Sequence, residues 1–211
     1  MIFNLQGAGT DLELELVKSK KYYDWLNEGK DENLQTHIFF DSSGIPVGTI
    51  EFIESILGPQ KPLDISPWIH REHREFEDVC PARGYVKSMT KLKDPLNGIW
   101  EAGESHPGKW FWTEEIKGVT GEYRVFLGRN GEILDVRNYV GWKNWPSAES
   151  LIVLAGNIFD CYDRPLSFDV MLTKTDDIHL LEIHDYFALG LYGFSDPAKL
   201  PFLINDWYKN K

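Results

Sequence analysis

The first 80 residues alternate short apolar segments with charged ones, in a pattern that predicts a small α/β region. Acidic residues and leucines alternate from Asp11, and the spacing then becomes helical, with Gly29 as the stop. Two later apolar segments are strand-like and are separated by the turn residues SSGIP. The expected elements are a strand over 1–6, a helix over 11–29, strands over 36–41 and 46–57, a proline-rich crossing loop over 57–67 and a short helix over 68–78.

From residue 84 the pattern changes to strands joined by turns. The clearest element is a hairpin over 121–142, because an Asn-Gly turn lies between two alternating apolar runs. A helix is expected over 147–163, where apolar residues recur at helical spacing after Ser147 as N-cap. Further strands are expected over 84–89, 110–116, 165–173 and 178–185.

The composition is that of an ordinary globular protein, with 42% apolar and 26% charged residues in a chain of 211. This length fits one compact domain, or two small lobes that share a cleft. The net charge of −11 argues against a nucleic-acid or membrane partner, although a local basic cluster can still bind a small anion. The first residues have no basic region and no long apolar region, no apolar run reaches about 20 residues, and Cys80 and Cys161 form no C-x-x-C pair, so we expect no signal peptide and a cytoplasmic protein with reduced thiols.

Two arginines fall on the expected hairpin. Arg124 lies in EYRVFL and Arg137 lies in ILDVRNYV, on the paired strand. Two guanidinium groups on one hairpin face form a surface that suits phosphate or carboxylate. The alternative, which the hairpin alone favours, is an exposed polar face.

Two carboxylates interrupt apolar strands, Asp169 in FDVML and Glu182 in LLEIHD. Acids on adjacent buried strands repel each other unless a positive charge lies between them. A divalent cation with oxygen ligands, such as Mg²⁺, removes that cost, and neutralisation by the arginines is the alternative. Together with Lys87, which stands alone in the apolar strand GYVKSM, these residues are the groups needed to bind a nucleoside triphosphate with Mg²⁺.

Several of these segments resemble a known family. YVKSM, EEIKG, EYRVFL with GEILDVRNYVG, FDVML and LLEIHDYFALGLYG occur in the order and spacing of the ATP-grasp fold. They resemble the clade of small ATP-grasp proteins named for two arginines and a lysine, often found in phages and bacteria, and IPVGTIEF is similar to that clade's N-terminal motif. The resemblance is strongest over 84–194. It implies an α+β ATP-grasp fold over 81–211, with a nucleotide cleft between two lobes, preceded by a small α/β region over 1–80.

The resemblance implies a set of nucleotide contacts. Lys87 would hold the α- and β-phosphates of ATP. The segment Glu114, Glu115, Ile116 and Lys117 would be the hinge between the lobes, with its backbone meeting adenine and an acid near it meeting ribose.

The resemblance also implies the groups at the reacting end. Arg124 and Arg137 would contact the γ-phosphate and an acyl-phosphate intermediate, with Arg124 shared between cofactor binding and catalysis. Asp169 and Glu182 would hold Mg²⁺.

One motif departs from the family. Where the family usually has Glu-x-Asn, this chain has Glu182-Ile183-His184, and neutral imidazole is a poorer ligand for Mg²⁺ than an amide oxygen. Three explanations are open: Asp185 supplies the missing ligand, His184 acts on the substrate, or metal binding is weakened.

The reaction implied is ATP-dependent ligation of a carboxylate to an amine or a thiol through an acyl phosphate. The substrates would be an amino acid, a peptide or a protein, with no nucleic acid and no membrane as partner, in the cytoplasm of a bacterium or of a phage-infected host. A catalytically weak nucleotide-binding or interaction protein is the alternative that the His184 departure favours. A sugar-binding module built on the eight Trp, nine Tyr and twelve Phe residues is a third interpretation.

Overall fold

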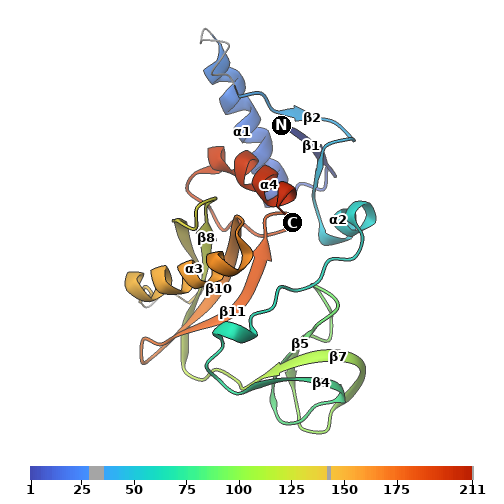
Figure 1. Ribbon diagram of the computed structural model, residues 1–211, viewed down its shortest axis with the longest axis vertical. Coiled ribbons are helices and arrows are strands. Elements are labelled where there is room, and N and C mark those ends of the chain that lie inside the picture. Colours follow the sequence, from blue (N-terminus) through green and yellow to red (C-terminus); the bar gives the residue numbers. More distant parts are fainter. Residues whose placement is uncertain (29–35, 142–143, 211) are drawn as a thin grey trace.

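The computed structural model describes residues 1–28, 36–141 and 144–210 of the chain (Figure 1). In these residues, helices and strands are mixed, and the strands form one three-stranded and two four-stranded sheets. Figure 1 shows them in three levels: an N-terminal region that carries both chain ends, a sheet with a helix on one face in the middle, and a second four-stranded sheet at the bottom. The expected α+β class is confirmed.

The N-terminal region is a parallel sheet with one long helix beside it. Its strands, in the order β2-β1-β3, are β1 (Ile2–Leu5), β2 (Phe39–Phe40) and β3 (Ile45–Val47). The helix α1 (Asp11–Asn27) begins after Thr10, whose hydroxyl accepts the Glu13 N–H in a capping box. The expected first strand and long helix are therefore confirmed, and Gly29 lies outside the described residues.

The expectation of a strand over 46–57 is wrong for most of its length. Only the first residues belong to β3, and α2 (Ile50–Leu57) is a helix. Thr49 caps it by accepting the N–H of Phe52, and isoleucines recur every third residue along it. Isoleucine and phenylalanine favour strands on average, so the composition of this segment predicted a strand. The isoleucines nevertheless recur at helical spacing, and the helix buries Ile53.

The small lobe is the antiparallel sheet at the bottom of Figure 1. Its strands, in the order β4-β7-β5-β6, are β4 (His73–Val79), β5 (Gly84–Ser88), β6 (Gly98–Trp100) and β7 (Ser105–Thr113). The helix expected over 68–78 is wrong, because β4 is an edge strand and only a 3₁₀ turn, η2 (Ser66–Trp68), precedes it. Charged side chains are usual on edge strands, and Phe76 is the position of β4 that packs against the tryptophans of the lobe.

The large lobe is the second antiparallel sheet, with α3 on one of its faces. Its strands, in the order β11-β10-β8-β9, are β8 (Val119–Leu127), β9 (Ile133–Gly141), β10 (Leu166–Thr173) and β11 (Ile178–Asp185). The helix α3 (Ala148–Tyr162) is capped by Ser147 and packs its apolar side on this sheet. The expected hairpin, helix and strand pair are confirmed.

The end of the chain returns to the N-terminal region. After η3 (Pro197–Lys199), the helix α4 (Leu200–Lys209) packs beside α1, where the Ser19 hydroxyl donates to the Pro197 carbonyl at 2.7 Å. The segment between β11 and η3 contributes Tyr186, Phe187 and other apolar residues to the same core. None of the helices in the described part of the chain is long and apolar enough to span a membrane.

The expected division of the chain after residue 80 stays a prediction. The strand β4 lies before that point and pairs with β7 of the small lobe. The helix α4 lies far beyond it and packs on the N-terminal region. Both ends of the chain are therefore tied into one structure with the two lobes.

Candidate active site

The strand register of the large lobe aligns four charged residues in one row. Asp169 of β10 is paired with Glu182 of β11 on one side and with Arg124 of β8 on the other. Arg124 is in turn paired with Arg137 of β9. Directly paired residues share a face of the sheet, and His184 shares it too because it follows Glu182 by two positions. The face opposite to α3 therefore carries the predicted arginines and acids together.

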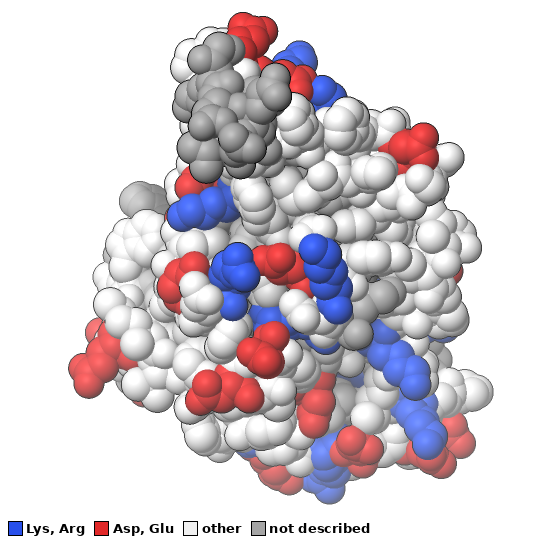
Figure 2. Space-filling view, turned by 45° about the horizontal axis from the view of Figure 1, so that its top comes forward, with Lys and Arg blue, Asp and Glu red and all other residues white. Residues whose placement is uncertain are grey.

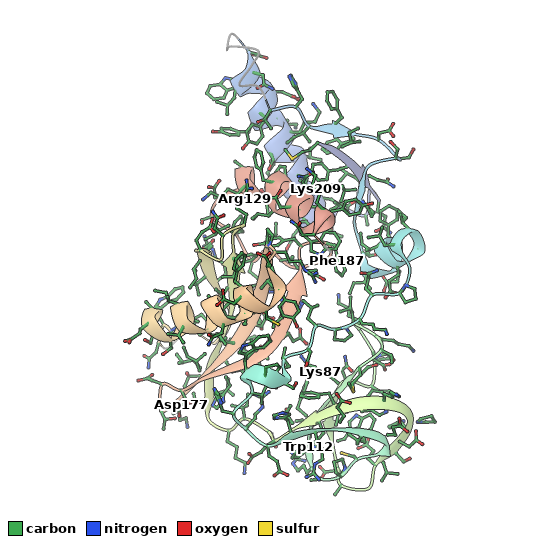
Figure 3. The ribbon with its side chains drawn as sticks, viewed as in Figure 1. Lys87, Trp112, Arg129, Asp177, Phe187 and Lys209 are labelled. Carbon is green, nitrogen blue, oxygen red and sulfur yellow. The ribbon has the colours of Figure 1, made fainter. Side chains whose placement is uncertain are left out.

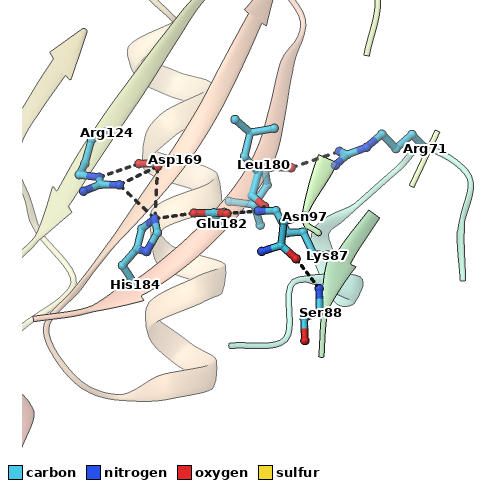
Figure 4. A network of polar contacts seen from close by, with 10 residues as sticks. Arg71, Lys87, Ser88, Asn97, Arg124, Asp169, Leu180, Glu182 and His184 are labelled. Atoms are coloured by element: carbon cyan, nitrogen blue, oxygen red, sulfur yellow. Dashed lines mark hydrogen bonds and ion pairs between the residues drawn. The ribbon is translucent and has the colours of Figure 1, made fainter. Parts of the chain in front are cut away.

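Arg124 and Asp169 form a buried ion pair at the centre of this row (Figure 4). The Nε and Nη2 atoms of Arg124 donate to the two carboxylate oxygens of Asp169, each at 2.8 Å. The side chains are only 7% and 6% exposed. Burial alone would raise the pKa of Asp169, but the hydrogen bonds from Arg124 and His184 lower it to about 2. Arg124 Nη1 also donates to the Gly190 carbonyl at 2.9 Å, which fixes the plane of the guanidinium.

Lys87 connects the two lobes. It stands on β5 of the small lobe, and its ammonium group donates to the Glu182 carboxylate and, at 3.1 Å, to the Leu181 carbonyl of the large lobe. Burial would raise the pKa of Glu182, but the hydrogen bond from His184 and the charge of Lys87 lower it. Figure 3 shows Lys87 at the level between the small-lobe sheet and the strands β10 and β11. The predicted phosphate lysine and a predicted metal ligand are thus in direct contact.

The imidazole of His184 lies between the two carboxylates. Its Nε2 atom is 3.2 Å from Asp169 Oδ2 and 3.1 Å from Glu182 Oε2. Burial would lower the pKa of His184, but these two hydrogen-bonding carboxylates raise it. One ligand atom from each of the three residues lies within 4.8 Å of the others, which is the arrangement of a site that could hold a metal ion. The carboxylate oxygens suit a hard divalent cation, and the imidazole nitrogen is the unusual member of the set.

Two cavities meet at this row. The larger has a volume of about 620 Å³ and the smaller about 390 Å³, within the usual range of small-molecule sites. Both are lined by Lys87, Phe111, Tyr139, Asp169 and Glu182, so the charged groups stand where the cavities join.

The smaller cavity contains the expected hinge. It is lined by Glu114, Glu115 and Ile116, which leave β7 after its last residue. Its apolar walls come from both lobes and from the segment before β4: Ile65, Phe111, Met171 and Leu181. An apolar cavity beside a segment that lies outside the strands suits a flat heterocyclic base.

Three predicted residues take no part in the contacts among Lys87, Arg124, Asp169, Glu182 and His184. Arg137 binds Asp135 through Nε at 2.8 Å, and Asp185 binds Arg164 at 2.9 Å. Lys117 is exposed. Of the three, only Asp185 is among the described residues that line either cavity, and burial raises its pKa. The roles expected for these side chains stay predictions.

The structure adds two tyrosines that the sequence did not single out. Tyr139 and Tyr192 stack with ring centroids 4.7 Å apart and planes at 15°, and Arg124 lies 5.0 Å from the Tyr192 ring centre. Tyr192 has φ of 48°, a left-handed conformation that is uncommon for a residue other than glycine. A Cβ on Gly190 would come within 3.1 Å of the Tyr192 ring, so the glycine makes room for the stack. The segment GLYG at 190–193, inside a motif already noted, was the available signal.

Arg71 is a further residue that the sequence did not point to. It lines the smaller cavity and donates to the Leu180 carbonyl at 3.1 Å, while its buried Nε atom has no hydrogen-bond partner in the described structure. Burial lowers its pKa to about 10. No periodicity marks this arginine, because it precedes β4 in a stretch of mixed charge.

The face of the molecule seen in Figure 2 has no large area of one charge, because basic and acidic side chains lie near one another with uncharged side chains between them. The positive charge available to an anionic ligand is therefore local. Within the larger cavity it comes from Lys61, Lys87, Lys93 and Arg124.

Comparison with solved structures shows the fold. N5-carboxyaminoimidazole synthase from Aspergillus clavatus, in complex with ADP and 5-aminoimidazole ribonucleotide, is similar with a TM-score of 0.54 and 12% identity, over 97% of this chain and 76% of that chain. D-alanyl-alanine synthetase A from Vibrio cholerae O1 biovar eltor is similar with a TM-score of 0.50 and 10% identity, over 99% and 97% of the two chains. The chain spans about half, 56%, of the N5-carboxyaminoimidazole ribonucleotide synthetase from Thermotoga maritima, which matches 91% of this chain with 12% identity and a TM-score of 0.47.

No curated protein matches this sequence. A family model matches residues 82–200, and it describes an ATP-grasp domain of family 2 in the clade named for two arginines and a lysine. The matched segment is more than half of the chain and contains Lys87, the charged row and His184. The resemblance seen in the motifs is thereby confirmed, and the protein belongs to family 2 of this clade of ATP-grasp domains, with the ATP-grasp fold.

Proposed function

We propose that this protein is an ATP-dependent ligase that joins a carboxylate to an amine or a thiol through an acyl phosphate. The observation that carries the proposal is the contact of Lys87 with Glu182 at the junction of the two cavities. This contact brings a lysine of the small lobe to the acids and the arginine of the large lobe. On one side lies the smaller cavity, which suits a nucleotide, and on the other lies the larger cavity, which suits an acceptor substrate.

The smaller cavity would hold the nucleoside. Its apolar walls would enclose adenine, and the backbone of 114–116 would provide hydrogen bonds to the edge of the base. The phosphates would then extend to the junction, where Lys87 donates to them. Glu115 lines this cavity, is half-buried and lies 3.4 Å from Arg83, and it is the acid that would meet the ribose hydroxyls.

The cation expected with ATP fits the carboxylates at the junction. Asp169 and Glu182 present oxygens on one face of the sheet, and crowded acids of this kind favour a bound cation. A divalent ion bound there would neutralise charge on the phosphate oxygens. Asp169 is positioned for this by Arg124, and Glu182 by Lys87.

The larger cavity would hold the carboxylate substrate. A carboxylate oxygen attacks the γ-phosphorus and ADP leaves, and the amine or thiol then attacks the acyl carbon and releases phosphate. Arg124 and Lys87 would stabilise the negative charge on the transferring group, so catalysis would consist of positioning and electrostatics. The cavity is lined by Lys61 and Lys93, which suit a carboxylate, and by apolar residues such as Leu63, which suit an amino acid or peptide.

The test is ADP release from ATP, measured with panels of amino acids, peptides and amines, and with hydroxylamine to trap an acyl phosphate as a hydroxamate. We expect ADP release that requires a carboxylate substrate, and hydroxamate formation in its presence. Tight nucleotide binding without hydroxamate or ADP release across these panels would contradict the ligase and favour a nucleotide-binding protein. Lys87→Met should reduce this ADP release, and Lys109→Met, at an exposed lysine on β7, is its matched control and should leave the release unchanged.

A further inference from the structure

The cluster of Asp169, Glu182 and His184 has the spacing of neighbouring ligands on one ion. Two ligands at right angles on bonds of about 2.1 Å lie roughly 3.0 Å apart. The distances from His184 Nε2 to Asp169 Oδ2 and Glu182 Oε2 are 3.2 and 3.1 Å. A six-coordinate ion could therefore use all three side chains with little movement.

The strand register directs the imidazole nitrogen toward these oxygens. His184 is paired with Ser167 on β10, so its side chain leaves the same face as Glu182 and Asp169. Its Nε2 atom also lies 3.1 Å from Arg124 Nη2 (Figure 4). A metal ion would bind the lone pair that Nε2 carries in the neutral tautomer with the proton on Nδ1, so metal binding would replace the contacts of this nitrogen with the two carboxylates and with the guanidinium.

Asp185 is not available as a replacement oxygen ligand. It follows His184 on β11, so its side chain leaves the opposite face of the strand. Arg164 Nε donates to its Oδ1 at 3.0 Å, and Arg164 Nη2 forms an ion pair with the same oxygen at 2.9 Å. Asp185 is also absent from the group of described residues whose ligand atoms converge. The third protein ligand at this position is therefore a nitrogen.

We propose that His184 makes this site selective for a first-row transition-metal dication, such as Mn²⁺, over Mg²⁺. Mg²⁺ is bound almost entirely by oxygen and keeps several waters, whereas imidazole is a good ligand for transition metals, whose affinities rise from Mn²⁺ to Cu²⁺. The role of the ion in this inference rests on the proposed function. Its binding is inferred from the three converging side chains alone.

The experiment uses the full chain, freed of metal, with a non-hydrolysable ATP analogue and MnCl₂. Electron paramagnetic resonance measures bound Mn²⁺, and its pulsed form detects a directly coordinated nitrogen. We expect a nitrogen signal that changes when the protein is produced with nitrogen-15 histidine, and displacement of Mn²⁺ by MgCl₂ only at an excess of about tenfold or more. In His184→Asn the nitrogen signal should vanish and the preference for Mn²⁺ over Mg²⁺ should fall about tenfold.

His179→Asn is the matched control, because His179 is a half-buried histidine on the same strand that lies outside the cluster. Its nitrogen signal and metal preference should equal those of the unmodified protein. Bound Mn²⁺ without a histidine-derived signal, an unchanged preference in His184→Asn, or no Mn²⁺ binding at all would each overturn the inference. The protein labelled with nitrogen-15 histidine shows whether a histidine coordinates Mn²⁺ without any substitution in the chain. A histidine signal in a protein that releases no ADP would support the metal inference and contradict the ligase.

Discussion

Asp169→Asn removes the negative charge from the buried pair with Arg124 while keeping the size of the side chain. The pKa of about 2 for Asp169, against an ordinary value of 3.8, corresponds to roughly 2–3 kcal/mol of stabilisation at neutral pH. Leaving a buried guanidinium without its partner costs about 3–5 kcal/mol in comparable pairs. We therefore expect Asp169→Asn to lower the free energy of unfolding by about 2–4 kcal/mol.

The measurement is urea unfolding followed by tryptophan fluorescence, over a range of pH. Asp169 has a lowered pKa, so its stabilisation is complete above about pH 5 and is lost as the pH falls through 3.8 toward 2. The difference between the unmodified protein and Asp169→Asn should be constant near neutral pH and should shrink in acid.

A double-mutant cycle separates the ion pair from other effects of the substitution. In an Arg124→Leu background, Asp169→Asn should cost much less, because the buried positive charge is gone. Asp160→Asn, at an exposed position of α3, should change stability by no more than about 0.5 kcal/mol. An equal cost of Asp169→Asn in both backgrounds would refute the argument that the pair stabilises this sheet.

Three further predictions concern ligands and the tyrosine stack. ATP with a divalent ion at 100 times its dissociation constant should stabilise the fold by about 2.7 kcal/mol and raise Tm by roughly 5–11 °C, and no shift at millimolar concentrations would contradict nucleotide binding. Lys87→Met should weaken ATP binding by about 10–100-fold in isothermal titration calorimetry, the value of a charged hydrogen bond, and unchanged affinity would transfer the phosphate contact to Lys91 or Lys93. Tyr192→Ala should lower kcat by about 2–30-fold, the value of a cation–π contact, while Tyr192→Phe should retain activity, since only the ring contacts Arg124. Gly190→Ala should have a smaller effect in the same direction, because the added methyl would lie 3.1 Å from the ring and would shift it slightly, and full activity in Tyr192→Ala would show that the stack does not position Arg124.

The elements that build the site were predictable because their signals are local. An Asn-Gly turn fixes the β8–β9 hairpin, and alternation within each strand then puts Arg124 and Arg137 on one face. The same alternation puts Asp169 and Glu182 on the face of the sheet opposite to most of the apolar residues that flank them in the sequence. The idea that two crowded acids need a positive neighbour was also sound, since Lys87, Arg124 and His184 all contact them.

The elements that were missed depend on contacts that are distant in the sequence. The strand β4 exists because β7 pairs with it and because Phe76 reaches the tryptophans of the small lobe. The helix α2 exists because its spacing, rather than its strand-favouring composition, matches the core of the N-terminal region. The stack of Tyr139 on Tyr192 joins residues on β9 and on the segment after β11, and no sequence period links two such positions.

A substitution at Glu182 shows how the structure changes an argument made from the sequence. With two crowded acids alone, Glu182→Gln would relieve repulsion and stabilise the protein. In the structure, Lys87 and His184 both contact Glu182, so the same change removes attractive partners instead. The acids Asp169 and Glu182 are contacted by Lys87, Arg124 and His184, which lie on three strands and in two lobes.

These contacts have a consequence for how ligands would bind under the proposed function. Lys87 is paired with Glu182 and Arg124 with Asp169, so each group that would meet phosphate is held by a group that would meet the cation. A nucleotide that draws Lys87 away leaves Glu182 beside Asp169, and a cation that takes the carboxylates leaves Lys87 without a partner. Either ligand alone therefore leaves a charge without its partner, and this costs free energy because Lys87, Arg124 and Asp169 are largely buried. When both ligands bind, Asp169 and Glu182 contact the cation in place of Arg124 and Lys87. The lysine and the arginine then contact the phosphates in place of the acids. The two ligands should thus strengthen each other's binding by the same factor, because coupling between sites is reciprocal.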